Sequence, residues 1–515
     1  MSHGPAFSMP TLRKARIRAA FYFTPALVLL LILGARASQS PDADASNAAA
    51  LLSANCATSG CHGGPGAYSF DATDPQTLID AKVILPGNAS GSEVISRLET
   101  GAMPMGGYQG KPGVKLPDAD IQTLRRWIDS GAHLPAPAAR PAGRPFISES
   151  NLLSAIARDL EGAPEADRRF FRYFSFVNLW NTSGTDDNAL AAYRDGLGRL
   201  VNSLSWKRDI VAPRMVVSEG VLARVDIRDY GWTVPMWNDI VAVYPYGVVP
   251  NDLGADAERI RALSGAIPPY VRADWFTAKA SVAPMYHEIL QLPDMLDGLE
   301  RRLGVNTMAN VRSGGARRFG VQDSGVSRNN RAMERHATTF GAYWKSFDFN
   351  GNRIEQNIFR DPVHLTPDGG EIIFSLPNGL QAYFIVDSQG RRIDAAPVTI
   401  VRDRTNPDDP AVRNGRSCMG CHFKGMNTFR DDVEPSLQSR AGALFDMTAA
   451  RTLYRGQPEL DRLLGEDNAR FAGAIRQVGG VPPAGATLEP INQLARRYEE
   501  ALTVQQAAVE LNLET

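Results

Sequence analysis

The sequence predicts a multidomain protein, with a small all-α part at the N-terminal side and a larger mixed α+β part that contains a small antiparallel sheet. Apolar residues at helical spacing mark the N-terminal part, whereas alternating β-branched and aromatic residues around tight-turn signals mark the larger part. A proline-rich stretch without periodicity, residues 135–146, separates the two and predicts a linker. With 515 residues, 43% of them hydrophobic, the chain is long enough for two or three domains with a large core.

The first 37 residues predict an export signal. Four basic residues between positions 13 and 18 precede an apolar run over residues 19–34, and Ala35-Arg36-Ala37 follows as a small-x-small cleavage pattern. We therefore expect a periplasmic protein. The alternative is a retained N-terminal membrane anchor, for which the run of 16 residues is shorter than the roughly 20 that span a bilayer.

The charge balance argues against a nucleic-acid partner. Residues 1–37 hold five Lys/Arg and no Asp/Glu, so the formal net charge of −1 becomes −6 once they are removed. A mildly acidic protein lacks the clustered Lys/Arg that binds phosphate backbones. Contact with a membrane is expected only if the N-terminal segment is retained.

The segment Cys418-Met419-Gly420-Cys421-His422 predicts covalent attachment of c-type haem, because it has the spacing C-x-x-C-H. Two thiols one helical turn apart can add to the two vinyl groups of one porphyrin, and His422 would be the proximal iron ligand. A disulfide and a zinc half-site are the alternatives, and zinc would need a second Cys/His pair to complete four ligands.

A second unit of the same kind lies near the N-terminus. Cys56 and Cys61 are separated by four residues, and His62 follows directly. All four cysteines of the chain thus belong to C-x(n)-C-H units. In an exported protein a cysteine pair would by default form a disulfide, but the adjacent histidines favour haem. We expect two covalent haem c groups.

A methionine is predicted as the sixth ligand of the first haem. Met103-Pro104-Met105 follows the first unit, and a thioether placed by a proline suits the far side of a haem iron. Met103 is the candidate and Met105 its rival. The alternative is that both are loop or core methionines.

A predicted helix closes this part of the chain. It begins near Asp118 or Asp120 and ends at Gly131, and its apolar residues fall on one face. The C-x(n)-C-H unit, the Met-Pro element and a helix ending in Trp-Ile-x-x-Gly-Ala together resemble a class I cytochrome c domain, in the wider-spaced form of planctomycete-type cytochromes. The resemblance covers residues 38–134. It implies a small helical fold with His62 and Met103 as axial ligands.

Residues 147–515 are predicted to form one α+β haem-binding domain. Helical patterns cover residues 151–160, 166–180, 187–204, 237–243, 256–263, two stretches of 282–302 broken at Pro293, 433–447, 458–478 and 491–511. Strand patterns predict a hairpin from 214–218 and 221–227, and a meander from 371–376, 380–387, 391–394 and 398–401 that turns at Asn378-Gly379.

This larger part resembles C-terminal modules of exported bacterial haem proteins that carry segments of the RADWF, SRNNR and S-C-M-G-C-H types. The corresponding segments are residues 272–276, 327–331 and 417–422. The resemblance implies architecture and export but no substrate.

The far side of the Cys418 haem has no obvious ligand in the sequence, because no Met-Pro element follows His422. His336 and His287 are candidates for this position, and an open iron is the alternative. His336, Arg335 and His287 are also the candidate catalytic residues. Further polar residues that could lie near a haem edge are Arg272, Asp274, Arg328 and Arg331.

These features predict a periplasmic dihaem c-type cytochrome that transfers electrons. Its partner would be a redox protein or a small-molecule electron donor or acceptor. The alternative is an enzyme, a dihaem oxidoreductase of peroxidase or oxidase type with the reactive haem at Cys418–His422.

Overall fold

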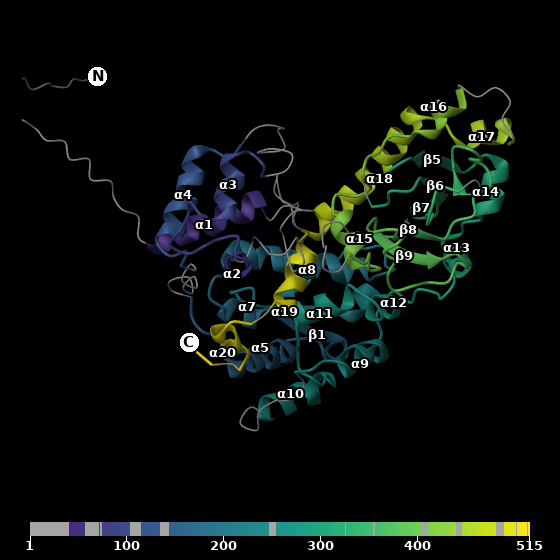
Figure 1. Cartoon of the computed structure of the whole chain (residues 1–515). Coiled ribbons are helices and arrows are strands. Elements are labelled where there is room, and N and C mark those ends of the chain that lie inside the picture. The colour runs from purple at the N-terminus through teal and green to yellow at the C-terminus, as the bar shows by residue number, and fades with distance from the viewer. Residues whose placement is uncertain are drawn as a thin grey trace, which may run out of the picture. The chain divides into compact units, whose positions relative to one another are not determined.

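The computed structural model describes residues 41–56, 72, 75–103, 115–133, 144–246, 254–324, 326–353, 356–402, 410–438, 445–479, 489–500, 502–511 and 513–514 (Figure 1). The predicted export signal and most of the predicted linker lie outside these residues. Across the part of the chain that is described, no helix combines the length and the apolar character that crossing a membrane requires.

Among the described residues before position 134, the structure has four helices: α1 (Pro41–Cys56), α2 (Pro75–Asp80), α3 (Glu93–Glu99) and α4 (Asp118–Asp129). Helix α4 confirms the helix that was predicted to begin near Asp118 or Asp120 and to end at Gly131. Its apolar stripe is buried, and the helix ends where Gly131 has φ +109°, a left-handed conformation that suits glycine. The indole nitrogen of Trp127 donates to the carbonyl of His133 at 2.7 Å, so the chain is held at the end of α4.

The first sheet has the strand order β2-β3-β1-β4. Its strands are β1 (Phe171–Ser175), β2 (Arg214–Met215), β3 (Leu222–Asp226) and β4 (Val271–Arg272). Strands β2 and β3 pair antiparallel, which confirms the predicted hairpin, while β1 and β4 pair parallel.

The prediction of one helix over residues 166–180 is wrong. This stretch instead contains α6 (Glu165–Arg168), β1 and α7 (Val177–Asn181). All five residues of β1 are buried, because the strand has neighbours on both edges and packing on both faces. A strand buried on both faces shows no apolar and polar alternation, so its period cannot be distinguished from that of a buried helix.

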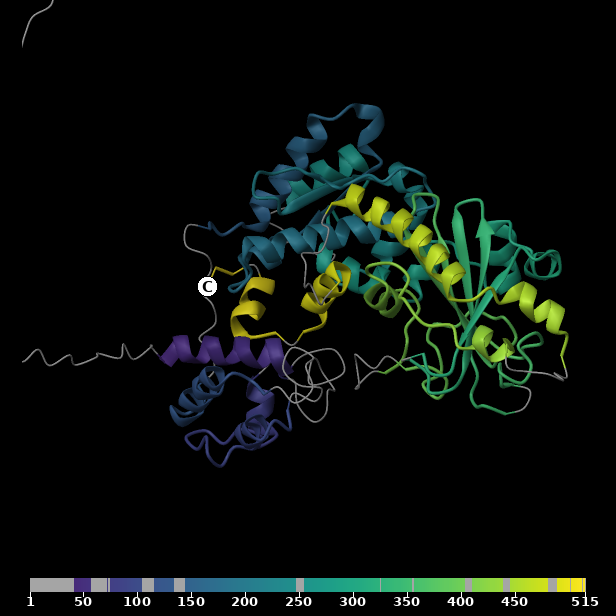
Figure 2. The ribbon, with the colours of Figure 1, turned by 90° about the horizontal axis from the view of Figure 1, so that it is seen from above.

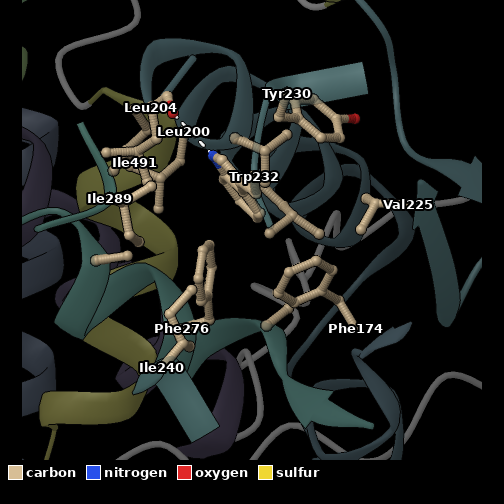
Figure 3. Packing of buried hydrophobic residues seen from close by; sticks show 14 of the residues in the cluster. Phe174, Leu200, Leu204, Val225, Tyr230, Trp232, Ile240, Phe276, Ile289 and Ile491 are labelled. Atoms are coloured by element: carbon tan, nitrogen blue, oxygen red, sulfur yellow. Dashed lines mark hydrogen bonds between the residues drawn. The ribbon is translucent and has the colours of Figure 1, made fainter. Parts of the chain in front are cut away.

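Helices pack around this sheet and form the main core of the chain. They are α5 (Glu149–Glu161), α8 (Asp187–Ser203), α9 (Val234–Ala242), α10 (Gly254–Ser264), α11 (Ala273–Ala280) and α12 (Met285–Ile289), with a 3-10 turn at Ile227–Tyr230. Figure 3 shows Phe174 of β1, Trp232 and Phe276 of α11 in this core. The Trp232 indole nitrogen donates to Leu204 O at 2.9 Å, so its one polar atom is satisfied inside an apolar cluster.

The second sheet has the strand order β5-β6-β7-β8-β9, and each strand pairs antiparallel with the next. Its strands are β5 (Arg317–Val321), β6 (Arg331–Thr338), β7 (Gly341–Phe347), β8 (Gly369–Ser375) and β9 (Gln381–Asp387). The β8–β9 hairpin was predicted and is confirmed, with Gly379 at φ +86° in its turn. The described residues 391–394 and 398–401 form no strand beyond isolated bridges at Arg391 and Arg392.

The predicted fold class is therefore wrong. The described residues form a mixed α/β structure with two sheets, of four and five strands, and a separate all-α N-terminal domain is not shown. The small antiparallel sheet of the prediction is only one hairpin of the second sheet. Strands β5 and β6 escaped prediction because Arg318, Arg331 and Glu334 are buried on them as ion pairs, which hides the apolar alternation. Strand β7 was not predicted either.

The remaining helices are α13 (Leu296–Leu303), α14 (Thr307–Ser313), α15 (Arg416–Cys421), α16 (Val433–Gln438), α17 (Met447–Leu453), α18 (Gln457–Val478), α19 (Pro490–Glu499) and α20 (Val504–Glu510). The one helix predicted over residues 491–511 is thus two. Figure 2 shows the long helix α18 beside the second sheet. Asp467 of α18 accepts bonds from Arg335 of β6 and Trp344 of β7, which fixes the helix to that face.

Candidate functional site

Helix α15 consists of little more than one turn and carries both cysteines of the C-x-x-C-H segment. The backbone N–H of Met419 donates to Gly415 O at 2.9 Å, and that of His422 donates to Cys418 O at 2.8 Å. Cys418 and Cys421 therefore lie one turn apart on the helix, as the spacing predicted. Cys418 packs against the main core, whereas Cys421 is exposed.

A glycine starts this helix for a steric reason. Gly415 has φ +94°, and a Cβ added there would lie 2.4 Å from the carbonyl oxygen of Ser281. Any other residue would strain the backbone and clash with the segment ahead of α12. Helix α15 is thus pressed closely against the main core.

The ring of His422 is oriented by a backbone carbonyl. Its Nδ1–H donates to Gly425 O at 3.2 Å, which leaves Nε2 with its lone pair. Histidines that bind metals commonly donate their other ring nitrogen to such a partner. Burial lowers the pKa of His422, so the ring is neutral at pH 7 and able to bind iron. The Tyr383 ring of β9 lies beside it, with 6.3 Å between ring centroids.

Helix α18 holds the loop that supplies this carbonyl. Asn468 accepts from the backbone N–H of Met426 at 2.6 Å and donates to Met426 O at 2.9 Å. Gly425 has φ +105°, and a Cβ there would lie 2.3 Å from the Asn468 side-chain oxygen. Sequence reasoning missed Gly425 and Asn468. A glycine three residues after the histidine was the one available signal, whereas Asn468 lies too far along the chain to be connected with it.

Other elements also anchor α15. Arg416 forms an ion pair with Glu499 of α19 at 2.8 Å. A Cβ on Gly420 would lie 2.4 Å from the Asn492 side-chain nitrogen, so α19 packs directly on the residue between the two cysteines. Helix α19 therefore helps to fix the position of α15.

The first C-x(n)-C-H unit is described only in part. Cys56 is the last residue of α1, and Met103 donates its backbone N–H to Arg97 O at 3.1 Å. Both side chains pack against one hydrophobic cluster formed by residues between 45 and 132. Cys61, His62 and Met105 lie outside the described residues, so the ligand assignment remains a prediction.

His336 lies on the face of the second sheet opposite to His422. Arg335 and His336 are neighbours on β6, so their side chains point to opposite faces of the sheet. Arg335 binds Asp467 of α18 on one face, and His336 lies opposite its cross-strand partner Tyr343 on the other. The chain of pairs Arg335–Trp344–Ile373–Tyr383 places Tyr383, and with it His422, on the Arg335 face.

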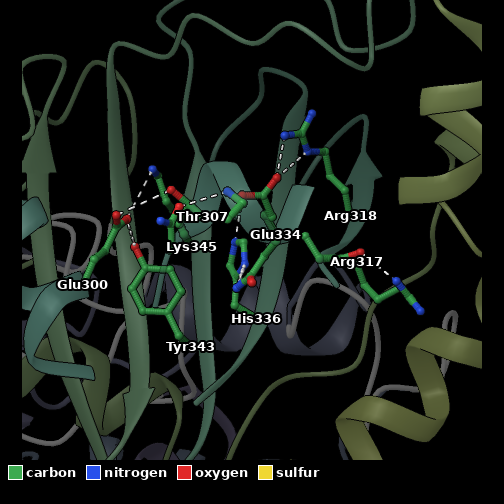
Figure 4. Close-up of polar contacts among 12 residues, drawn as sticks. Glu300, Thr307, Arg317, Arg318, Glu334, His336, Tyr343 and Lys345 are labelled. Carbon is green, nitrogen blue, oxygen red and sulfur yellow. Dashed lines mark hydrogen bonds and ion pairs between the residues drawn. The ribbon is translucent and has the colours of Figure 1, made fainter. Parts of the chain in front are cut away.

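The His336 ring is fully buried, and both of its nitrogens are bonded. Nε2 donates to Glu334 at 2.9 Å, and Nδ1 accepts from Asn310 at 3.2 Å (Figure 4). The structure does not bring His336 and His422 together.

His287 lies near the start of α15, but both nitrogens of its ring already face partners. Asn414, at the start of the turn into α15, donates to His287 Nε2 at 2.8 Å, and Nδ1 lies 3.6 Å from an Asp394 oxygen. His287 is 4% exposed, and burial lowers its pKa to about 4. The arrangement identifies His287 as a neutral residue that supports the segment before Cys418.

We expect the stability of the protein to fall between pH 6.5 and pH 4 because of His287. The unfolded chain binds a proton at this histidine near pH 6.5, but the folded protein does so only near pH 4, so acid favours unfolding. At pH 5 the loss should be up to about 2 kcal/mol. Urea unfolding at pH 7 and pH 5 measures it, and His287→Gln should show a smaller drop than the unmodified protein. Equal drops would show that other groups cause the pH dependence.

The arginines proposed from the sequence are mostly paired within the protein. Arg331 binds Asp348 and Glu371, Arg335 binds Asp467, and Arg272 binds Asp274 and Glu510, whereas Arg328 is exposed. The paired guanidinium groups therefore stabilise the packing of strands and helices.

The residues around α15 fit a covalently attached haem. Two cysteines one turn apart and a neutral, oriented histidine form the donor set that such a group requires. Among the described side chains, no group of three or more His, Cys, Asp or Glu is arranged to hold a metal ion by itself. Comparisons with protein-family models, with curated proteins and with solved structures gave no match.

Proposed function

We propose that the protein is an exported dihaem c-type cytochrome that transfers electrons. The observation that carries the proposal is the Nδ1–H bond of His422 to Gly425 O beside two cysteines on one helical turn. Haem supplies an iron that changes between the ferric and ferrous states. Cys418 and Cys421 would hold its porphyrin, and His422 would offer Nε2 to the iron.

The exposure of Cys421 supports electron transfer. One attachment point packs into the core and the other lies at the surface, so the edge of the bound group would be reachable from solvent. A redox partner could approach that edge without a channel through the protein. His422 itself is kept in place by Gly425 and Tyr383, which limits its reorientation when the iron changes charge.

Haem content tests the proposal. The full chain, produced in a host that attaches c-type haem, should show two covalent haems by haem staining of a denaturing gel and by intact mass. A mass without haem would overturn the proposal. A single haem would show that only one of the two C-x(n)-C-H units binds haem.

Ligand binding separates electron transfer from the enzymatic alternative. His287 and His336 are both occupied by other bonds, so neither is positioned as a second axial ligand among the described residues. A carrier whose iron receives its sixth ligand from another residue of the chain should show spectra that carbon monoxide and cyanide leave unchanged. A spectral shift assigned to the Cys418 haem would favour a dihaem oxidoreductase of peroxidase or oxidase type instead.

A further inference from the structure

A small pocket lies directly against the haem-attachment helix. Met419 of α15 and Phe423 form part of its wall, together with Tyr383 of β9. Further apolar residues come from α18 and α19. Two charged side chains, Arg199 of α8 and Glu489, also line the pocket, as do Leu380, Gln381 and Ser203. A pocket that is otherwise mostly apolar thus contains an ion pair next to the proposed haem.

This ion pair is deeply buried. The closest nitrogen and oxygen atoms of Arg199 and Glu489 are 3.6 Å apart, and their side chains are 2% and 3% exposed. Glu489 also accepts from the backbone N–H of Asn492 at 2.9 Å, as the cap of α19. Burial raises the pKa of Glu489 to about 7, although the charge of Arg199 opposes this rise. The carboxyl group is therefore able to change protonation at neutral pH.

Glu489 is linked to α15 through its packing. Asn492, which it caps, packs on Gly420 between the two cysteines. Glu489 and Tyr383 line the same pocket, and the Tyr383 ring lies beside that of His422, with 6.3 Å between the ring centroids.

We propose that Glu489 takes up a proton when the haem at Cys418–Cys421–His422 is reduced, an inference that rests on the proposed function. One electron from the external donor converts ferric to ferrous iron, and one proton from solvent converts the Glu489 carboxylate to a neutral carboxyl. The added electron makes the site more negative, and in a poorly polarisable interior this disfavours a nearby carboxylate. Arg199 stays protonated throughout.

Other titratable groups face the pair and must be distinguished from Glu489. The charge of Asp195 on α8 favours the protonated form of Arg199, and burial raises the pKa of Asp195, as it does for Glu489. Tyr383 faces the pocket from β9, and the cysteines of α15 would be consumed by the thioether bonds. Asp195 is therefore the matched control, since it lies on the same helix as Arg199 but does not line the pocket.

The experiment is a redox titration of the full dihaem protein at several pH values. The potential of the Cys418 haem should fall with pH just above 7, approaching about 59 mV per pH unit, because a tenfold change in proton concentration is worth that much for one electron. Glu489→Gln should abolish the slope, and Asp195→Asn should keep it. A slope that survives in Glu489→Gln, or is lost only in Asp195→Asn, overturns the proposal.

Infrared difference spectra provide a second readout if Glu489→Gln fails to fold. Reduction of the unmodified protein should produce a carboxyl C=O band that shifts in deuterated water, and its absence would overturn the proposal. Failure of the proposed function has a different signature, because no second haem would titrate at all.

Discussion

Serine at both Cys418 and Cys421 is expected to remove one of two covalent haems completely. The thiols are the only groups of α15 that can bond to the porphyrin, and a hydroxyl does not replace a thiol in that addition. Intact mass should fall by one haem, and haem staining per molecule should be halved. The haem at Cys56 and Cys61 should remain attached and reducible.

The control for this variant is Met419→Leu. Met419 lies between the two cysteines and is 5% exposed, so the substitution alters the same helix at similar volume without removing a thiol. It should retain both haems. If the double serine variant stained like the unmodified protein, C-x-x-C-H would not be an attachment site here.

Alanine at Glu334 is expected to cost about 3–5 kcal/mol of unfolding free energy, the loss typical of breaking a buried ion pair. Glu334 is 2% exposed and accepts from Arg318 and His336 (Figure 4). Burial alone would raise its pKa, but the His336 bond and the Arg318 charge bring it down to about 2. Without the carboxylate, the Arg318 charge stays buried beside Phe347 without its anionic partner.

Urea unfolding at pH 7 measures this loss. Glu466→Ala is the matched control, because Glu466 pairs with Arg462 on the exposed side of α18, where both side chains are more than half exposed. It should cost less than about 1 kcal/mol. A loss at Glu334 no larger than that at Glu466 would show that the buried cluster is not important for stability.

The contribution of Glu334 to the free energy of unfolding should depend on pH. Since the pKa of Glu334 is lower in the folded protein than in the unfolded chain, this contribution should vanish as the pH falls from about 4.5 towards 2.

Several elements could be predicted from the sequence because their signals are local. Helices α5 and α8 show apolar residues at helical spacing and begin at capping residues, Ser148 and Asp186. The β8–β9 hairpin follows from Asn-Gly between two alternating runs. Strand β1 could not be predicted in this way, because the strands beside it, β3 and β4, lie far along the chain. Strands β5 and β6 were missed because buried ion pairs such as Arg318–Glu334 hide the apolar alternation.

The sequence by itself determined the two C-x(n)-C-H units and the one-turn spacing of Cys418 and Cys421, because helical spacing and thiol chemistry are properties of neighbouring residues. Only the tertiary structure decided which groups surround His422. Asn468 of α18 binds the backbone of Met426, next to Gly425, Tyr383 comes from the second sheet, and Glu489 caps α19. It also decided that His336 faces away from His422, because one residue along a strand reverses the face of the sheet. The pairing of buried charges is likewise a tertiary property, since each partner is chosen by packing rather than by distance in the sequence.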